Sequence, residues 1–524
     1  MSSTLPLNEA ASPAFAPIRP RPVALETRAH GRRRRIAAVI ACSLAVVAGV
    51  SAGMLAASGH PAIVFAFPAV LIPLAIWKWD EAGIIVVLAI ATVIEQDQYV
   101  LGPGVSPPFT EKINLFHSIT LGSGVSLFEV LLLLILLMTV MKGALRGTLR
   151  SPHSALSRSV GAFVLVVVVG FGLGLSHGGA FRWAMWEVRP FIYLGAMFWL
   201  SASLLDTRRA LRAVLWTVVL GNGFKALQGL PIYFASRHLN PRPEYLLAHE
   251  ESFFFGLFIF LTIGLWIFEQ RGALRTTATA LLPVVFLANL ANSRRTAWAI
   301  LALGLLALLV IAYASLPHRR RLLRRLGVVA LVASAVYFPA YWNSAGTIGQ
   351  PAHALHSQFS PDARDLASNQ YRVQENANLQ FNIRQSHNIG MGFGVPIDYA
   401  LPIQDIRDGV NGDPMLNYTP HDDILYVWMR LGIVGEAVFL MMIAAAIFRA
   451  VELARVRDQE LALFGMLTVC AVFAYLVMGY EDMGITWFRI ALCMGILFGS
   501  TEAALRLARR ERDVPLIQPV GTSA

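Results

Sequence analysis

Residues 296–314 read TAWAILALGLLALLVIAYA, a run of 19 residues that contains no charged side chain. A helix of this length is long enough to cross the ~30 Å hydrocarbon core of a bilayer. The turn Ser293-Arg294-Arg295 precedes the run, and one histidine and five arginines follow it at 318–325. An uncharged run between charged connections is typical of a membrane-spanning helix. The same pattern recurs along the chain.

The composition of the 524-residue chain agrees with this pattern, because 56% of its residues are hydrophobic and only 14% are charged. A soluble domain carries about 25% charged residues, so this chain lacks the polar surface needed to face water. The hydropathy rule predicts an all-α, polytopic integral membrane protein with about 12–14 transmembrane helices. The apolar runs lie near 36–57, 61–77, 82–95, 125–141, 159–176, 190–205, 210–234, 252–268, 276–292, 296–314, 325–342, 422–449, 461–478 and 485–505.

Basic residues concentrate in alternate connections between these runs, for example 142–158, 208–212, 271–275 and 449–457. Such alternation marks the cytoplasmic side of a multi-pass protein of the cell (inner) membrane, and it places both termini in the cytoplasm. The net charge of +11 therefore comes from short clusters. A nucleic-acid-binding protein would instead carry a continuous basic face. We therefore expect the basic residues to lie beside a lipid bilayer and to bind no nucleic acid.

The predicted organisation has three parts: a disordered cytoplasmic tail at 1–35, a transmembrane domain at 36–505 and a second cytoplasmic tail at 506–524. The longest polar connection, 343–421, falls outside the cytoplasm. It mixes aromatic, amide and basic residues. A structureless loop of that length is uncommon in a compact protein, so we expect partial helical order in it.

Several arginines lie in connections on the outer side, where the inside-positive bias predicts few. Arg294 and Arg295 are the pair between two apolar runs, and two interpretations stay open for them. They are snorkelling side chains at the lipid headgroups, or they form an anion site, since a guanidinium matches phosphate oxygens with a fork of donors. The chain has no glycine-rich phosphate loop and no HExxH zinc motif, so we expect no cofactor and no metal.

The long outer connection ends in the segment PHDDIL at 420–425, where the next apolar run begins. A neutral His421 can accept a proton near physiological pH, or it serves as a polar anchor at the helix start. Asp422 and Asp423 look like a metal-binding pair. Adjacent side chains on a helix nevertheless point about 100° apart, and the preference of a helix N-terminus for negative charge is the simpler explanation.

An ordered series of motifs runs through residues 285–505. A Ser-Arg pair precedes an apolar run, an arginine, an isoleucine and Gly-x-Gly follow in the long connection, and the series ends in His-Asp-x-x-Leu and Gly-Ile-x-Gly. These motifs are Ser293 with Arg294 or Arg295, Arg372, Ile383, Gly390 with Gly392, His421 to Leu425, and Gly432 to Gly435. In this order and spacing the region resembles the bacterial O-antigen ligase and O-antigen polymerase superfamily. Asn376 and His387 depart from the tryptophan and the proline usual in that family.

The resemblance implies a GT-C-like, metal-independent, inverting glycosyltransferase of cell-surface polysaccharide biosynthesis. Its donor would be a glycan on undecaprenyl diphosphate, and its acceptor a hydroxyl on a glycan, a glycolipid or a protein. A positioned histidine would remove the acceptor proton, and arginines would stabilise the diphosphate leaving group. The residues expected in these roles are His421 as catalytic base and Arg372, Arg294, Arg295 and, as a weaker candidate, Arg189 at the diphosphate, with Gly390, Gly392, Asp422 and Asp423 as supporting motif residues.

Alternatives remain within the family and outside it. Ligase, polymerase and protein oligosaccharyltransferase share these motifs, so the sequence does not choose between them. A transporter or flippase of lipid-linked glycans would need polar groups near the bilayer midplane, whereas the polar residues here gather at the outer ends of the apolar runs. A structural or sensory membrane protein would leave the ordered motif series unexplained.

Overall fold

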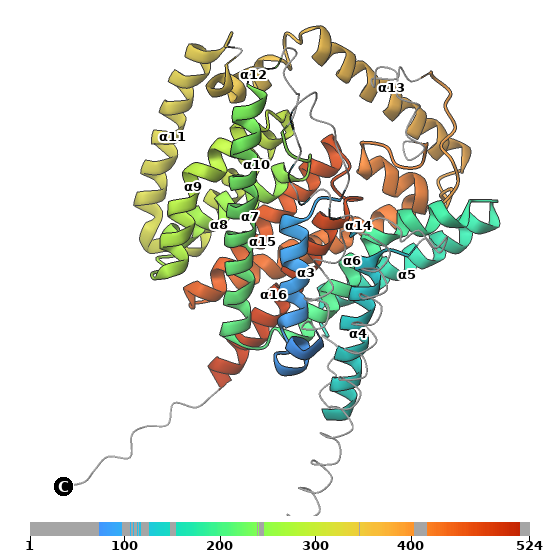
Figure 1. Cartoon of the computed structure of the whole chain (residues 1–524), viewed down its shortest axis with the longest axis horizontal. Helices are drawn as coiled ribbons and strands as arrows, with labels where there is room; N and C mark the ends of the chain where they lie inside the picture. The colour runs from blue at the N-terminus through green and yellow to red at the C-terminus, as the bar shows by residue number, and fades with distance from the viewer. Residues whose placement is uncertain are drawn as a thin grey trace, which may run out of the picture.

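The computed structural model describes residues 73–96, 125–146, 153–237, 246–344, 346–402 and 417–513, together with a few isolated positions between 105 and 116 and residue 239. The chain is a bundle of helices (Figure 1). Within the described part of the chain, nine helices are long and apolar enough to cross a membrane. They are α4 (Leu127–Arg146), α5 (Ala155–Ser176), α7 (Arg208–Ser236), α9 (Ala273–Ala291), α10 (Arg295–Ser315), α11 (Arg320–Tyr341), α14 (Asp423–Ala454), α15 (Gln459–Glu481) and α16 (Phe488–Asp513).

Three further helices of the described chain pack with them: the shorter apolar helices α3 (Ala82–Val93) and α8 (Glu251–Ile267), and α6 (Phe181–Leu204). Most helices begin and end within a few residues of the predicted runs, which supports the prediction of a polytopic membrane protein. The run predicted at 36–57, most of the run at 61–77 and the tail at 1–35 lie outside the described residues.

Two helix boundaries differ from the prediction. The helix predicted at 190–205 already begins at Phe181, because Glu187 and Arg189 interrupt the apolar run but are buried against charged partners, Arg430 and Glu129. The last helix continues through the predicted tail to Asp513. Arg509 there lies 2.9 Å from Glu452 of α14, so an inter-helix contact extends it.

α15 and α16 form the centre of the bundle, whereas α11 lies at its edge with almost no buried surface (Figure 1). α16 packs closely against α6 through two glycines four residues apart. A Cβ atom on Gly495 would lie 2.4 Å from the Leu194 carbonyl oxygen, and one on Gly499 2.6 Å from that of Phe198. Small residues at this spacing let helix backbones approach each other in a membrane.

The segment 343–421 carries the helical order that its composition predicted, in α12 (Gln350–His356) and α13 (Ala363–Gln385). Both helices lie at the end of the molecule opposite the last turns of α16 (Figure 1). Following the predicted topology, we call this the outer end and the opposite one the inner end. Residues 403–416 of the segment lie outside the described residues.

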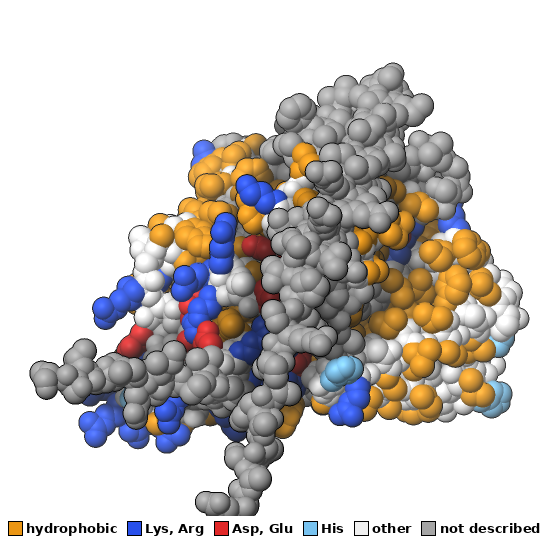
Figure 2. All heavy atoms as spheres, turned by 90° about the horizontal axis from the view of Figure 1, so that it is seen from below, with side chains coloured by type: hydrophobic (Ala, Val, Ile, Leu, Met, Phe, Trp, Pro, Cys, Tyr) orange, Lys and Arg blue, Asp and Glu red, His pale blue; other side chains and the backbone are white. Residues whose placement is uncertain are grey.

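Basic side chains gather at the inner end, as the alternation along the sequence predicts. Figure 2 views the molecule from that side and shows Lys and Arg side chains grouped over part of the surface. Arg208 at the start of α7 joins three helix ends there, since its Nη2 lies 2.7 Å from Asp458 and 2.6 Å from Glu511.

Charged side chains are also buried between α3, α7, α8 and α16, near their outer ends. Arg489 of α16 lies 2.7 Å from Glu251 and 3.4 Å from Glu250. Lys225 of α7 pairs with Glu95 and lies 4.0 Å from Glu251. Since a buried charge is costly unless it is paired, these contacts fix how the four helices pack together.

Candidate functional site

His421 lies where the outer segment joins α14, and α13 holds its ring. Its Nδ1 is 3.1 Å from Glu375 Oε1, and its backbone N–H donates to Glu375 Oε2 over 3.1 Å. The Tyr371 hydroxyl donates to the same carboxylate, and its ring meets the His421 ring edge-on at 5.3 Å. A carboxylate accepts hydrogen bonds, so Nδ1 carries the ring proton and Nε2 presents a lone pair. This arrangement suits a histidine that removes a proton.

The two aspartates after His421 have structural roles. Asp422 caps α14, because its Oδ1 accepts hydrogen bonds from the backbone N–H groups of Ile424 and Leu425. Asp423 Oδ2 accepts from the backbone of Ile485 and Thr486, over 2.6 and 3.0 Å. The two carboxylates thus have separate partners, which agrees with the helix N-terminus explanation.

Arg372, on the outer side of α13, reaches the end of α15. Its Nη1 lies 3.0 Å from Glu481 Oε2, and both side chains remain partly exposed. A half-exposed ion pair of this kind contributes little to stability, so it can open when another anion competes for the guanidinium.

The turn at Ser293 sends its two arginines in different directions. Arg294 Nη2 lies 2.6 Å from His249 Nε2, and His249 Nδ1 lies 2.5 Å from Asp482 Oδ2. Arg295 begins α10 and lies 3.4 Å from Asp365, in the first turn of α13. The structure therefore separates two residues that the sequence left equivalent.

Three consecutive residues at the end of α15 bring these groups together. Glu481 contacts Arg372, Asp482 contacts His249, and the Met483 N–H donates to the His421 carbonyl over 3.0 Å. Burial by itself raises the pKa of Asp482, but His249, His421 and Arg372 outweigh it and hold that pKa well below its usual range. We call His421, Glu375, Arg372, Arg294, His249, Glu481 and Asp482 the outer cluster.

Arg189, the weaker candidate for the diphosphate, has another charged neighbour. Its Nε lies 2.7 Å from Glu129 of α4. Glu187, two residues earlier, lies 2.6 Å from Arg430 of α14, and both side chains are fully buried. Arg189 thus contacts α4.

The glycine pair anchors the outer segment to the membrane helices. α14 is broken at Gly432, and the Gly392 N–H donates to the carbonyl of Arg430 there, over 3.0 Å. Gly390 and Gly392 have φ angles of 101° and 78°, values that favour glycine. A Cβ on Gly392 would lie 2.1 Å from the Gly174 nitrogen of α5. These glycines allow the segment to wedge between α5 and the break in α14.

Sequence reasoning assigned no role to four members of the outer cluster, Glu375, His249, Glu481 and Asp482, nor to Tyr371 beside them. Glu375 and Tyr371 flank Arg372 on α13, so a helical projection would have placed them near it. His249 and Asp482 stand beside acidic residues in outer connections. Their pairing across 233 residues leaves no local signal.

One group of side chains in the described residues could hold a metal ion. Ligand atoms of His353, Asp362 and Asp365 lie within 4.8 Å of one another. Asp362 caps α13, and Arg295 already brings a positive charge to Asp365. We assign no metal to this group, because Asp362 and Asp365 each have one of these other contacts.

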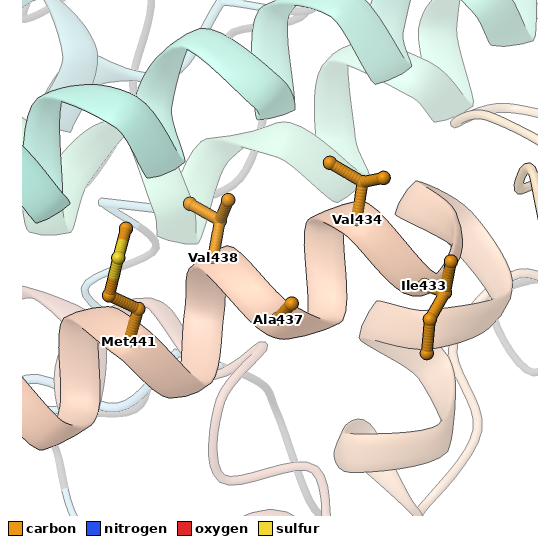
Figure 3. Close-up of a pocket in the computed structure, with 5 residues that line it drawn as sticks. All are labelled: Ile433, Val434, Ala437, Val438 and Met441. Carbon is orange, nitrogen blue, oxygen red and sulfur yellow. The ribbon is translucent and has the colours of Figure 1, made fainter.

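An apolar hollow of about 340 Å³ lies beyond the break in α14 (Figure 3). Its lining consists of Ile433, Val434, Ala437, Val438 and Met441. Three of these side chains are largely exposed on the surface of the bundle. The hollow suits contact with lipid hydrocarbon and contributes no polar group to the outer cluster.

Comparison of the sequence with models of known protein families finds no match, and comparison with curated proteins finds no significant match.

Proposed function

We propose that this chain is an inverting membrane glycosyltransferase that moves a glycan from undecaprenyl diphosphate to an acceptor hydroxyl at the outer face of the cytoplasmic membrane. The observation that carries the proposal is the outer cluster, in which an oriented histidine and two arginines meet at residues 481–483. The type of reaction is inferred from the motif series, which resembles that of the O-antigen ligase and polymerase superfamily. The location in a bilayer is inferred from the apolar helices.

The proton transfer is assigned to His421. Its Nε2 takes the proton of the acceptor hydroxyl while that oxygen forms the new bond to the anomeric carbon. Glu375, on Nδ1, keeps the ring in the required tautomer and stabilises the imidazolium that forms.

Stabilisation of the diphosphate leaving group is assigned to the arginines. As the bond between the anomeric carbon and the diphosphate oxygen breaks, its electron pair stays on the diphosphate and increases the negative charge. Arg372 and Arg294 are the cations that would stabilise this charge, and they need no reorganisation if they already face it. In this reaction Glu481 must give up Arg372 to the diphosphate.

The test is glycan synthesis in a deletion strain that carries variant protein at matched levels. We expect His421→Ala to lower the rate of glycosyl transfer by about 10²–10⁴-fold, the usual contribution of a general base. Arg372→Lys should also lower it, since an ammonium cannot replace a guanidinium fork. His318→Ala is the control, because His318 is exposed at the inner end of α10.

Full activity of His421→Ala would contradict this mechanism. Reconstitution with a lipid-linked glycan then separates the two classes of function: a transferase forms a new glycosidic bond, whereas a flippase changes only the leaflet in which the lipid lies. The lipid that accumulates in the deletion strain distinguishes a polymerase, which leaves single repeats, from a ligase, which leaves long chains.

A further inference from the structure

The start of α11 and the turn between α8 and α9 meet at the inner end and form a surface rich in arginine. Arg319 joins them, since its Nη1 donates to the Ile267 carbonyl over 3.1 Å and its guanidinium pairs with Glu269. Besides these two charges, residues 266–275 and 316–325 contain six arginines and no acidic residue. We call the six the basic edge: Arg271, Arg275, Arg320, Arg321, Arg324 and Arg325.

Aromatic rings place part of the basic edge at the membrane–water boundary. The Arg275 guanidinium lies 4.4 Å from the centre of the Trp266 ring, and that of Arg320 lies 5.1 Å from the centre of the Tyr313 ring. The two rings are 51% and 40% exposed. Tryptophan and tyrosine concentrate at the depth of the lipid headgroups. The arginines beside them therefore lie at the depth of the lipid phosphates.

The rest of this charge projects from the first turns of α11. Arg321, Arg324 and Arg325 are exposed, and no carboxylate of the described chain pairs with them. Arg321 and Arg325 stand about one turn apart on the helix, a spacing at which like charges repel each other. A ligand that brings negative charge would relieve this repulsion.

Other arginines at the inner end are neutralised by the protein itself. Arg212 of α7 donates from Nη2 to Glu460 of α15 over 2.8 Å. Arg449 of α14 donates from Nη2 to Glu502 of α16 over 2.9 Å. The inner end thus has one part in which carboxylates match the arginines and one part, at α11, in which they do not.

α11 extends the basic edge with an apolar surface. The helix lies at the margin of the bundle (Figure 1), and only 6% of its membrane-spanning stretch is buried. Val328, Leu331 and Val336 are 59%, 71% and 66% exposed. Such a surface is suited to contact with lipid hydrocarbon. A ligand that matches both parts needs an anionic head at the arginines and hydrocarbon chains along the helix.

We propose that the basic edge and α11 together bind an anionic phospholipid of the inner leaflet, with its phosphate at the arginines and its acyl chains along α11. Guanidinium groups suit this ligand because their donors match phosphate oxygens. A zwitterionic headgroup adds a cation that the arginines repel, so a headgroup with net negative charge binds more tightly. This inference goes beyond the proposed function and does not depend on it, because the basic edge lies opposite the outer cluster.

Lipid binding to the purified full-length protein tests the proposal. Native mass spectrometry gives the affinity of the first bound lipid, for phosphatidylglycerol and for phosphatidylcholine with the same acyl chains. Phosphatidylglycerol should bind about tenfold or more tightly, and the difference should shrink at high salt. Arg321→Gln/Arg325→Gln should weaken phosphatidylglycerol binding about tenfold or more and leave phosphatidylcholine binding within about twofold of wild type.

Arg455→Gln/Arg457→Gln is the matched control. It removes two exposed arginines from another connection at the inner end and changes the net charge by the same amount. Its affinity for phosphatidylglycerol should stay within about threefold of wild type. Since all four substituted positions are exposed, both double variants should keep the melting temperature of wild type in phosphatidylcholine.

Three results would overturn the proposal. Equal affinity of wild type for the two lipids would show that the headgroup charge is not recognised. Equal losses in the two double variants would show that net charge, and not the basic edge, determines binding. Inorganic phosphate that binds as tightly as phosphatidylglycerol would show that the arginines take a free anion and that α11 contributes nothing.

Discussion

Two histidines of the outer cluster both donate from Nδ1 to a carboxylate, His421 to Glu375 and His249 to Asp482. Their other nitrogens differ. Nε2 of His249 already accepts from Arg294, whereas Nε2 of His421 has no hydrogen bond among the described residues. A histidine can remove a proton only through a nitrogen with an available lone pair. The two histidines therefore differ in what they can do: His421 has a nitrogen suited to accept a proton, whereas both ring nitrogens of His249 contact protein groups.

At the residue scale, Glu375→Gln tests the orientation of His421. The amide keeps the shape but loses the negative charge that stabilises the imidazolium. We expect the rate of glycosyl transfer to fall at least about tenfold, and by less than in His421→Ala. The measurement is the initial rate with purified protein at matched folded concentration.

Tyr371→Phe is the matched control for this prediction. It removes one hydrogen bond to Glu375 but keeps the ring beside His421, so the rate should stay within about threefold of wild type. An equal loss in Tyr371→Phe and Glu375→Gln would show that packing around His421, and not charge, determines the rate.

At the scale of elements, the break in α14 is the feature that shapes the site. In a continuous helix the backbone N–H and C=O groups pair with each other. The break at Gly432 leaves several of these groups without a partner inside the helix, and the segment at 388–394 forms hydrogen bonds with them. The Ile433 N–H donates to the Asn388 carbonyl over 2.9 Å, and the Met391 N–H to that of Met429 over 2.9 Å. The outer part of α14, which follows directly from His421, is thus tied to the chain that leaves α13.

Gly392→Ala should loosen this attachment. The added Cβ meets the backbone of Gly174, and alanine disfavours a φ of 78°. Overpacking and the left-handed backbone together should lower the free energy of unfolding by about 2–4 kcal/mol. The measurement is the melting temperature in detergent, which should fall.

Gly172→Ala on α5 is the comparison for that variant. A Cβ there meets nothing within 4 Å, and alanine favours a helix over glycine by about 1 kcal/mol. Its melting temperature should equal or exceed that of wild type. A Gly392→Ala protein as stable as Gly172→Ala would refute the anchoring role.

The helices were predictable because length and apolarity are local properties of the sequence. The start of α6 was not, since the partners that make Glu187 and Arg189 tolerable lie on other helices. His421 and Arg372 could be proposed from their motifs, but Glu375, His249 and Asp482 depend on contacts between distant segments. The choice between Arg294 and Arg295 depends on the direction of each side chain at a helix start, which no pattern of residue types specifies.

At the scale of the whole molecule, the two ends carry different chemistry. The inner end holds arginines paired across helix ends, such as Arg208 with Asp458 and Glu511. The outer end holds histidines and arginines together with carboxylates in one cluster. The paired histidines of the outer cluster lie at the outer end, so we expect them to make that end sensitive to pH near neutrality.

Stability should therefore depend on pH through His249, which faces Arg294, Asp482 and His421. Burial and Arg294 lower its pKa from the ordinary value of 6.5. The folded state thus binds fewer protons than the unfolded state, so stability is complete above pH 6.5 and falls as the pH drops below it. We expect a lower melting temperature at about pH 5.5 than at about pH 7.5. The difference should be smaller in His249→Gln, and an equal difference in both proteins would contradict the assignment.

Arg489 and Glu251, buried partners near the outer ends of α16 and α8, stand 238 residues apart in the chain. Ribosomes add about 5–20 residues per second, so roughly 10–50 s separate the synthesis of the two charges. Of the two cations that lie near Glu251 in the folded protein, only Lys225, at 4.0 Å, has been synthesised during that interval. The charges of the four helices can be matched only after α16 has entered the bilayer. Among the described helices, α16 is the last to leave the ribosome, and it supplies the arginine that these carboxylates require.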